Sequence, residues 1–104
     1  MESMMVTLSD LIEHGFIRPP LELEKSYKGQ RLTAEIRDDG SVHCMGDRYE
    51  SLSTAAGMAR KTVIGSRPGR KYPQTNGWTF WHFRDTDGTL QPLDVLRKRY
   101  PNER

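Results

Sequence analysis

Histidine, serine and acidic residues occur in this sequence without the spacing that catalysis or metal binding requires. The three histidines, His14, His43 and His82, are far apart in the chain and lack metal-ligand spacing. The pair Asp38 and Asp39 precedes a glycine, which is typical of a turn and not of an acid pair. We therefore expect no metal, no cofactor and no catalytic residues, and we predict that the chain is not an enzyme.

One short pattern superficially resembles the carboxylate–lysine site of a nuclease. Glu22, Glu24 and Lys25 lie in a stretch where charged and apolar residues alternate. Alternation is the pattern of a strand with one buried face, so it places both glutamates on the solvent-facing side. Acidic residues are ordinary on such a face, and we do not assign them a catalytic role.

Basic residues are concentrated in the second half of the chain. Residues 1–57 carry six Lys/Arg and ten Asp/Glu, whereas residues 58–104 carry ten and four. Such groups attract polyanions, although basic residues at helix ends also simply solvate the surface and complement the helix dipole. The candidates for contact with the phosphates of a polyanion are Arg60, Lys61, Arg67, Arg70, Lys71, Arg97 and Lys98.

An aromatic run over residues 78–84 has high strand propensity. As a strand it would direct Trp78, Phe80 and His82 to one face, and Trp81 and Phe83 to the other. One interpretation is a buried central strand with hydrogen-bonded indoles at its margin. The other is a strand with one packed face, whose opposite face stacks on a flat ligand such as a nucleobase. Both remain open at this point.

Length and composition favour one small domain over residues 1–104. The hydrophobic share is 35% and the charged share 29%, which predicts a lean core and a heavily solvated surface. The longest strongly apolar run is Met4, Met5 and Val6, too short for a membrane span or a secretory signal. Cys44 is the single cysteine and cannot form an internal disulfide, which fits a cytoplasmic protein.

The hydrophobic pattern predicts an α+β fold: a small antiparallel sheet, made of a meander and the aromatic-rich strand, packed with two to three short helices. In the first half, Thr7 or Ser9 can cap a helix that ends before Gly15. Alternating residues then predict strands at 21–27 and 31–37, joined near Lys28 and Gly29. Shorter strands follow at 42–45 and 48–49, with a turn at Gly46–Asp47 between them.

In the second half, Ser51 or Ser53 is a plausible N-cap for an alanine-rich helix that fades by about Val63. Residues 65–75 contain glycines, prolines and basic residues, so we expect a mobile loop there. After the aromatic run the chain turns at 85–88, and Pro92 opens a last short helix.

The string Asn76-Gly77-Trp78-Thr79-Phe80-Trp81-His82-Phe83 resembles the C-terminal segment of cell-cycle-regulated adenine DNA methyltransferases. The wider layout, over about residues 7–99, is similar to the restriction enzyme adenine methylase associated domain, or RAMA domain. The matching parts are 8–12, 27–29, 39–40, 49, 51–56 and the Asn-Gly-Trp-x-Phe-Trp signature at 76–81.

This resemblance implies a small α+β DNA-binding module that is fused to adenine methyltransferases and restriction-linked proteins and thought to read modified DNA. The catalytic methyltransferase motifs are missing: Pro19-Pro20 follows an arginine instead of Asp or Asn, and no glycine-rich motif for S-adenosylmethionine is present. The binding role is therefore transferred, and catalysis is not. Candidates for base contacts or a recognition pocket are Ser53, Thr54, Asn76, Trp78 and Trp81.

Two functional hypotheses from different classes follow. The first is a non-catalytic DNA-binding module, and a candidate reader of methylated DNA, in a bacterial restriction or defence system. The second is a protein-interaction or oligomerisation module whose exposed aromatic residues dock on a methyltransferase or nuclease. The sequence decides neither between single- and double-stranded DNA nor which face of the aromatic run is exposed.

Overall fold

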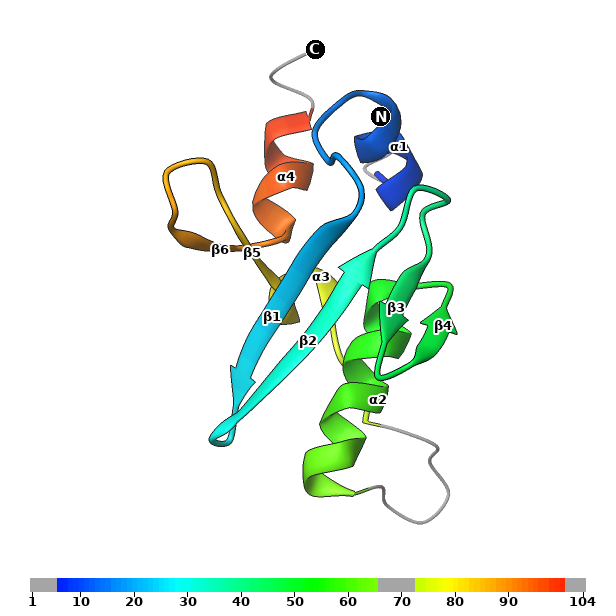
Figure 1. Cartoon of the computed structure of the whole chain (residues 1–104), viewed down its shortest axis with the longest axis vertical. Coiled ribbons are helices and arrows are strands. Elements are labelled where there is room, and N and C mark those ends of the chain that lie inside the picture. The colour runs from blue at the N-terminus through cyan, green and yellow to red at the C-terminus, as the bar shows by residue number, and fades with distance from the viewer. Residues whose placement is uncertain (1–5, 66–72, 101–104) are drawn as a thin grey trace.

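The computed structural model describes residues 6–65 and 73–100 (Figure 1). The chain forms an antiparallel sheet packed with short helices, which confirms the predicted α+β class. The elements are α1 (Leu8–Glu13), β1 (Leu21–Tyr27), β2 (Gln30–Ile36), β3 (Val42–Cys44), β4 (Asp47–Tyr49), α2 (Leu52–Ile64), α3 (Gly77–Phe80), β5 (His82–Arg84), β6 (Leu90–Pro92) and α4 (Asp94–Arg99). Most of the loop predicted at 65–75 lies outside the described residues.

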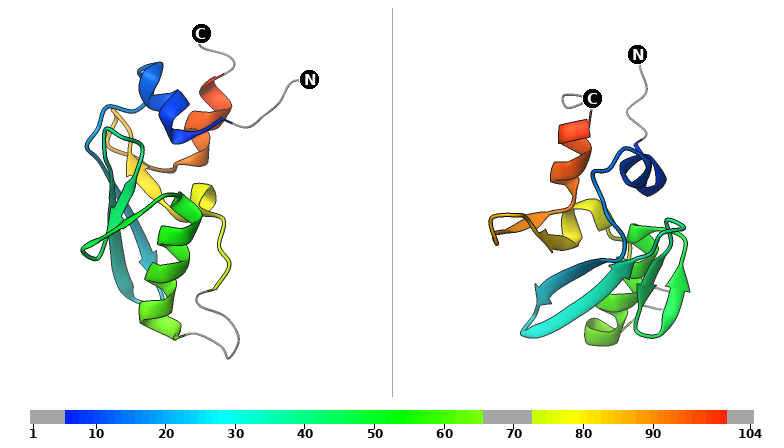
Figure 2. Two further views of the ribbon diagram at one scale, coloured as in Figure 1. Left: turned by 90° about the vertical axis from the view of Figure 1, so that its right-hand side faces the viewer. Right: turned by 45° about the horizontal axis from the view of Figure 1, so that its top comes forward.

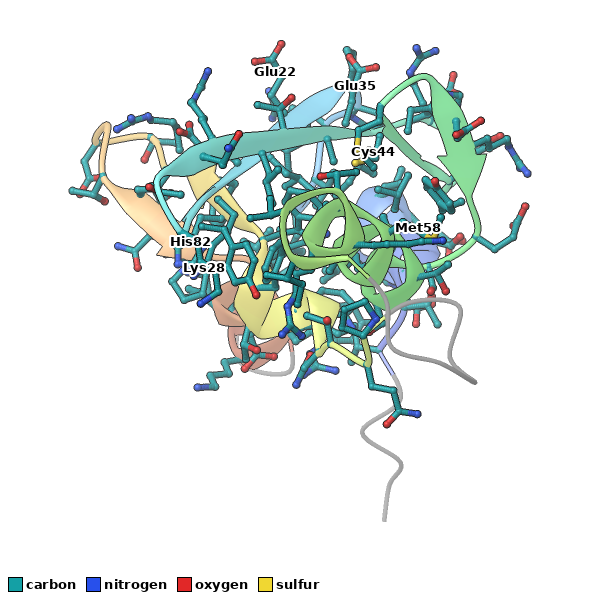
Figure 3. The ribbon with its side chains drawn as sticks, turned by 90° about the horizontal axis from the view of Figure 1, so that it is seen from below. Glu22, Lys28, Glu35, Cys44, Met58 and His82 are labelled. Atoms are coloured by element: carbon teal, nitrogen blue, oxygen red, sulfur yellow. The ribbon has the colours of Figure 1, made fainter. Side chains whose placement is uncertain are left out.

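The strands are ordered β4-β3-β2-β1-β5-β6, and every neighbouring pair is antiparallel. The predicted alternation sets the two faces: Leu23, Ala34 and Ile36 are buried on one side, whereas Glu22 and Glu35 pair across strands on the other. Figure 3 shows these two glutamates pointing away from α2. The sheet therefore has one covered face and one open, charged face.

Two tight turns fix the register of the sheet. Tyr27 pairs with Gln30, so only Lys28 and Gly29 connect β1 to β2, and both have positive φ angles of 49° and 81°. A two-residue turn with this backbone matches the right-handed twist of its strands. The β3–β4 turn is built in the same way, one residue earlier than predicted, at Met45 and Gly46.

Helix α2 covers the buried face of the sheet (Figures 2 and 3). Ala55, Ala56 and Ala59 are completely buried, because small side chains allow a helix to approach a sheet closely. Ser51 is the N-cap, its Oγ accepting a hydrogen bond from the Thr54 backbone nitrogen at 3.1 Å. One of the two predicted caps, Ser51, is thus confirmed as the start of this helix.

Helices α1 and α4 lie at the other end of the molecule from the β1–β2 turn (Figure 1). Thr7 and Asp10 form a reciprocal capping box that starts α1, which confirms Thr7 over Ser9. Pro92 was expected to open the last helix, but it belongs to β6, and α4 begins at Asp94. Within the described residues no helix is both long enough and apolar enough to cross a membrane.

The predicted strand over 78–84 is wrong in its first half. Residues Gly77–Phe80 form the helical turn α3, and only His82–Arg84 are a strand. One reason is local: Asn76 caps the turn, its Oδ1 accepting a hydrogen bond from the Trp78 backbone nitrogen at 3.0 Å. The expected alternation of aromatic side chains is therefore broken, and Phe80, Trp81 and Phe83 are all buried.

The turn α3 is seated directly on the first turn of α2. A Cβ atom on Gly77 would lie 2.3 Å from the Leu52 carbonyl carbon and 2.5 Å from the Ser53 backbone nitrogen. The indole Nε1 of Trp81 donates a hydrogen bond to the Leu52 carbonyl oxygen at 3.2 Å, and the ring is completely buried. Glycine is required at 77 because any larger residue collides with the backbone of α2.

We predict that Gly77→Ala destabilises the protein by about 1–3 kcal/mol, because the added methyl group must push α3 away from α2. In an unhindered helix the same change would increase stability. The measurement is urea denaturation followed by circular dichroism, with Thr79→Ala in the same turn as the control. An unchanged or increased midpoint for Gly77→Ala would show that the contact is not tight.

Candidate nucleic-acid interface

A shallow polar hollow of about 450 Å³ lies where α2 begins and α3 meets it. It is lined by Ser53, Thr54, Gln74, Thr75 and Asn76. The sequence-based candidate Asn76 is therefore brought together with Ser53 and Thr54, which lie more than twenty residues earlier in the chain. Hydroxyl and amide groups in one hollow provide both donors and acceptors for a ligand with a patterned polar edge.

Each of these side chains uses one acceptor to hold the local structure. The Ser53 Oγ accepts a hydrogen bond from the Gly77 backbone nitrogen at 3.0 Å, and the Asn76 Oδ1 caps α3. Among the described residues, neither the Ser53 hydroxyl hydrogen nor the Asn76 amide NH2 has an acceptor. The fold thus fixes these two side chains through their acceptors, while their donors have no partner among the described residues.

Arg60 holds one wall of the hollow in place. Its Nε donates to the Tyr27 hydroxyl at 3.0 Å, while its Nη1 donates to the Gln74 carbonyl oxygen at 3.2 Å and to Thr75 Oγ1 at 2.9 Å. The guanidinium also lies 5.4 Å from the centre of the Tyr27 ring. Arg60, which the sequence predicted as a phosphate contact, therefore positions one wall of the hollow in the fold.

A second hollow, of about 340 Å³, lies beside Trp78 between α1 and the start of α2. Its apolar walls include Val6, Leu8 and Leu52, and the Arg97 guanidinium lies 4.5 Å from the centre of the Trp78 ring. Trp78 is half-buried, so part of its indole remains accessible. Arg97 and Trp78 thus form a stacked cation–aromatic pair at the edge of this hollow.

Trp81, predicted to shape a pocket or touch bases, presents no exposed surface to a base in this arrangement. Its side chain is completely buried and its only polar atom is hydrogen-bonded to α2. The ring could stack on a base only if α3 left α2. The interpretation that places the indole in the core, with its nitrogen hydrogen-bonded, describes this residue correctly.

The basic residues near the C-terminus are bound to carboxylates. Arg97 Nη2 lies 2.5 Å from Asp94 Oδ1, and Lys98 Nζ lies 3.7 Å from the other oxygen of the same carboxylate. Arg99 contacts Asp85 at 2.8 Å, and this hydrogen bond lowers the pKa of the aspartate carboxyl. Their positive charge is therefore partly neutralised within the fold. Arg67, Arg70 and Lys71 lie outside the described residues.

The nuclease-like pattern of Glu22, Glu24 and Lys25 is not assembled on the open face of the sheet. Glu24 is ion-paired with Arg31 and Arg84, and Lys25 pairs with Leu32 on the opposite face of the sheet from Glu22 and Glu24. The carboxylate–lysine pattern seen in the sequence is thus divided between the two faces. Across residues 6–65 and 73–100 no three His, Cys, Asp or Glu side chains gather as metal ligands would.

Two residues of the polar hollow were not predicted from the sequence, namely Gln74 and Thr75. They lie at the end of the segment that we read only as a loop. What places them is the contact with Arg60, fourteen and fifteen residues away, and no local sequence signal reports such a contact.

A known protein family matches this chain. The family described as Restriction Enzyme Adenine Methylase Associated, or RAMA, matches residues 2–104. The match covers essentially the whole chain, so this protein belongs to the RAMA family. By its description the family is associated with the adenine methylases of restriction systems. The Asn-Gly-Trp-x-Phe-Trp signature that carried the resemblance is the segment that forms α3 and docks it on α2.

We predict that Ser53→Ala lowers the free energy of unfolding by about 1–3 kcal/mol, because the buried Gly77 N–H loses its acceptor. The matched control is Thr54→Ala in the same hollow, which should change stability by no more than about 0.5 kcal/mol. Thermal and urea unfolding of the two variants give the comparison. Equal stabilities would mean that the Ser53 hydroxyl does not hold α3.

Proposed function

We propose that this RAMA domain is a non-catalytic DNA-binding module that reads the methylation state of DNA in a restriction-modification setting. The observation that carries the proposal is the polar hollow, which offers fixed hydrogen-bond donors on Ser53 and Asn76 beside a basic, acid-free part of the chain. Residues 51–84 contain no Asp or Glu and six Lys or Arg. The association of the family with adenine methylases supports DNA as the partner.

The polar hollow suits the hydrogen-bonding edge of a base, and the apolar hollow suits a methyl group on that base. Basic side chains supply affinity by neutralising phosphates, whereas selectivity depends on groups that touch base edges. Donors on Ser53 and Asn76 match the acceptors on a base edge. The apolar hollow beside Trp78 supports a role in detecting a methyl group, since an N6-methyl on adenine is an apolar increment. Discrimination by such a pocket is worth only about 1–3 kcal/mol.

The alternative function, a protein-interaction module, is less well supported by the structure than DNA binding. It requires exposed aromatic residues, but Phe80, Trp81 and Phe83 are buried and Trp78 is half-buried against Arg97. Large hydrophobic residues that are exposed within the described ranges come from three separate elements or turns, namely Met45, Ile64 and Leu90. Such scattered exposure is normal for a soluble surface and does not define a docking patch.

The test is a fluorescence-anisotropy titration with matched unmodified and N6-methyladenine DNA, duplex and single-stranded, at two salt concentrations. We expect binding that weakens as salt rises and that favours methylated DNA. Salt-sensitive binding without preference would overturn the reading role and leave a general DNA tether. Absence of binding at low salt would overturn the DNA-binding function and favour the interaction module.

We further predict that Asn76→Ser weakens DNA binding about fivefold or more, the equivalent of about 1 kcal/mol, because the amide donors are lost. Serine is as good an N-cap as asparagine, so α3 should remain folded. Gln91→Ser, the same amide-to-hydroxyl change on β6, serves as the matched control. Titration of both variants with the same duplex decides the point, and equal affinities would exclude the Asn76 amide as a DNA contact.

A further inference from the structure

The basic residues of the described ranges divide into two groups. One group is ion-paired with carboxylates and comprises Arg31, Arg37, Arg48, Arg84, Arg97, Lys98 and Arg99. The other has no carboxylate within ion-pair distance among the residues that the structure describes, and comprises Arg18, Lys25, Lys28, Arg60 and Lys61.

Three of the unpaired cations surround one pair of aromatic rings. Lys28 Nζ lies 5.7 Å and the Arg60 guanidinium 5.4 Å from the centre of the Tyr27 ring, and Lys25 Nζ lies 5.6 Å from the centre of the Phe80 ring. The two rings are 5.8 Å apart, in edge contact. These five residues are called the hairpin-tip cluster below. Lys61, the neighbour of Arg60 on α2, adds a further positive charge beside it.

The chain segments that form the cluster carry no negative charge. Residues 25–34, which span the β1–β2 turn, contain no Asp or Glu, and neither does any part of 51–84. In Figure 1 the β1–β2 turn and the last turn of α2 lie at the same end of the molecule, away from α1 and α4. Among the described residues, Lys25, Lys28 and Arg60 form no ion pair with a carboxylate, so a ligand that supplies negative charge would bind favourably there.

The cluster is also continuous with the polar hollow. Arg60 belongs to the cluster through Tyr27 and to the hollow through Gln74 and Thr75. A DNA strand that presents a base edge to the hollow would bring its own flanking phosphates close to this region. Phosphate contacts fix the register of a nucleic acid, while base contacts specify its sequence.

We propose that the hairpin-tip cluster binds the phosphate backbone of DNA, with Lys25 and Lys28 as its principal phosphate contacts. The inference rests on the proposed DNA-binding function and adds two residues that lie outside the basic half of the sequence. It assigns a smaller share of phosphate binding to Arg97, Lys98 and Arg99, whose charge is shared with Asp94 and Asp85. Arg60 acts in both regions, as a positioning residue and as a cation.

The experiment compares two charge-matched double variants in salt titrations with one short fluorescein-labelled duplex. The first, Lys25→Gln with Lys28→Asn, removes two charges from the cluster. Lys28 has a φ angle of +49°, and asparagine adopts this conformation readily, so the turn should be preserved. The second, Arg37→Gln with Arg48→Gln, removes two charges from ion-paired positions on the open side of the sheet.

We expect the slope of log K against log salt to become less steep by about one for each lysine removed in the first variant, and to stay at the wild-type value in the second. A third variant, Lys25→Arg with Lys28→Arg, retains the charge and should keep the wild-type slope. Circular dichroism melting of all three establishes that the fold is intact.

The failure of this inference differs from the failure of the proposed function. If wild-type protein binds the duplex in a salt-dependent manner but the first variant keeps its slope, the hairpin-tip assignment is wrong and the DNA-binding function stands. The assignment is equally wrong if the slope of log K against log salt falls by the same amount in both double variants. That result would mean that only the net charge of the protein matters, and not where the charges lie. If wild-type protein does not bind DNA, the proposed function fails and the inference fails with it.

Discussion

The contact between the first residue of α3 and the first turn of α2 is the constraint on which the site depends. Gly77 is the residue that allows the two backbones to meet, and Trp81 anchors the turn from inside by its hydrogen bond to the Leu52 carbonyl. The contact brings Asn76 beside Ser53, and it directs the chain into β5 next to β1. In the family signature, Gly77 and Trp81 are thus explained by the packing of α3 on α2. Asn76 is explained by the hollow that this packing creates.

The distribution of charge divides the molecule in a second way. On the open side of the sheet, acidic and basic residues neutralise one another, as in the pairs of Arg31 with Glu24 and Arg37 with Glu35. Around the β1–β2 turn and the second half of α2, cations rest on aromatic rings without carboxylates in the same segments. Under our proposal this difference directs DNA to one side of the protein, where the polar hollow also lies.

Sequence patterns predicted the elements that local residues decide. Alternation located β1 and β2, Lys28-Gly29 marked their connection, and small residues with a serine cap located α2. The aromatic run failed because its strand propensity is overridden by the Asn76 cap and the contact of Gly77 with α2, and the second of these involves residues twenty-five positions apart.

The candidate site, too, was predictable from the sequence only in part. Ser53, Thr54 and Asn76 came from a family resemblance and are adjacent in space, although only a DNA titration tests their role. Gln74 and Thr75 gave no signal, because their places are set by contacts with Arg60. The sequence marked Lys28 only as a turn residue, and the contact of Lys25 with the Phe80 ring joins segments that are far apart in the chain. A charge count by halves of the chain pointed to the basic C-terminal group, yet those residues are the ones that pair with Asp85 and Asp94.

The most direct test of this account is to map the DNA surface by nuclear magnetic resonance, following backbone amide shifts of ¹⁵N-labelled protein as a methylated duplex is added. The account predicts that the largest shifts occur at Ser53, Thr54, Thr75 and Asn76 and around the β1–β2 turn at Lys28. The open face, represented by Glu22, Thr33 and Glu35, should show little change. Shifts concentrated on that open face, or no shifts at all, would contradict it.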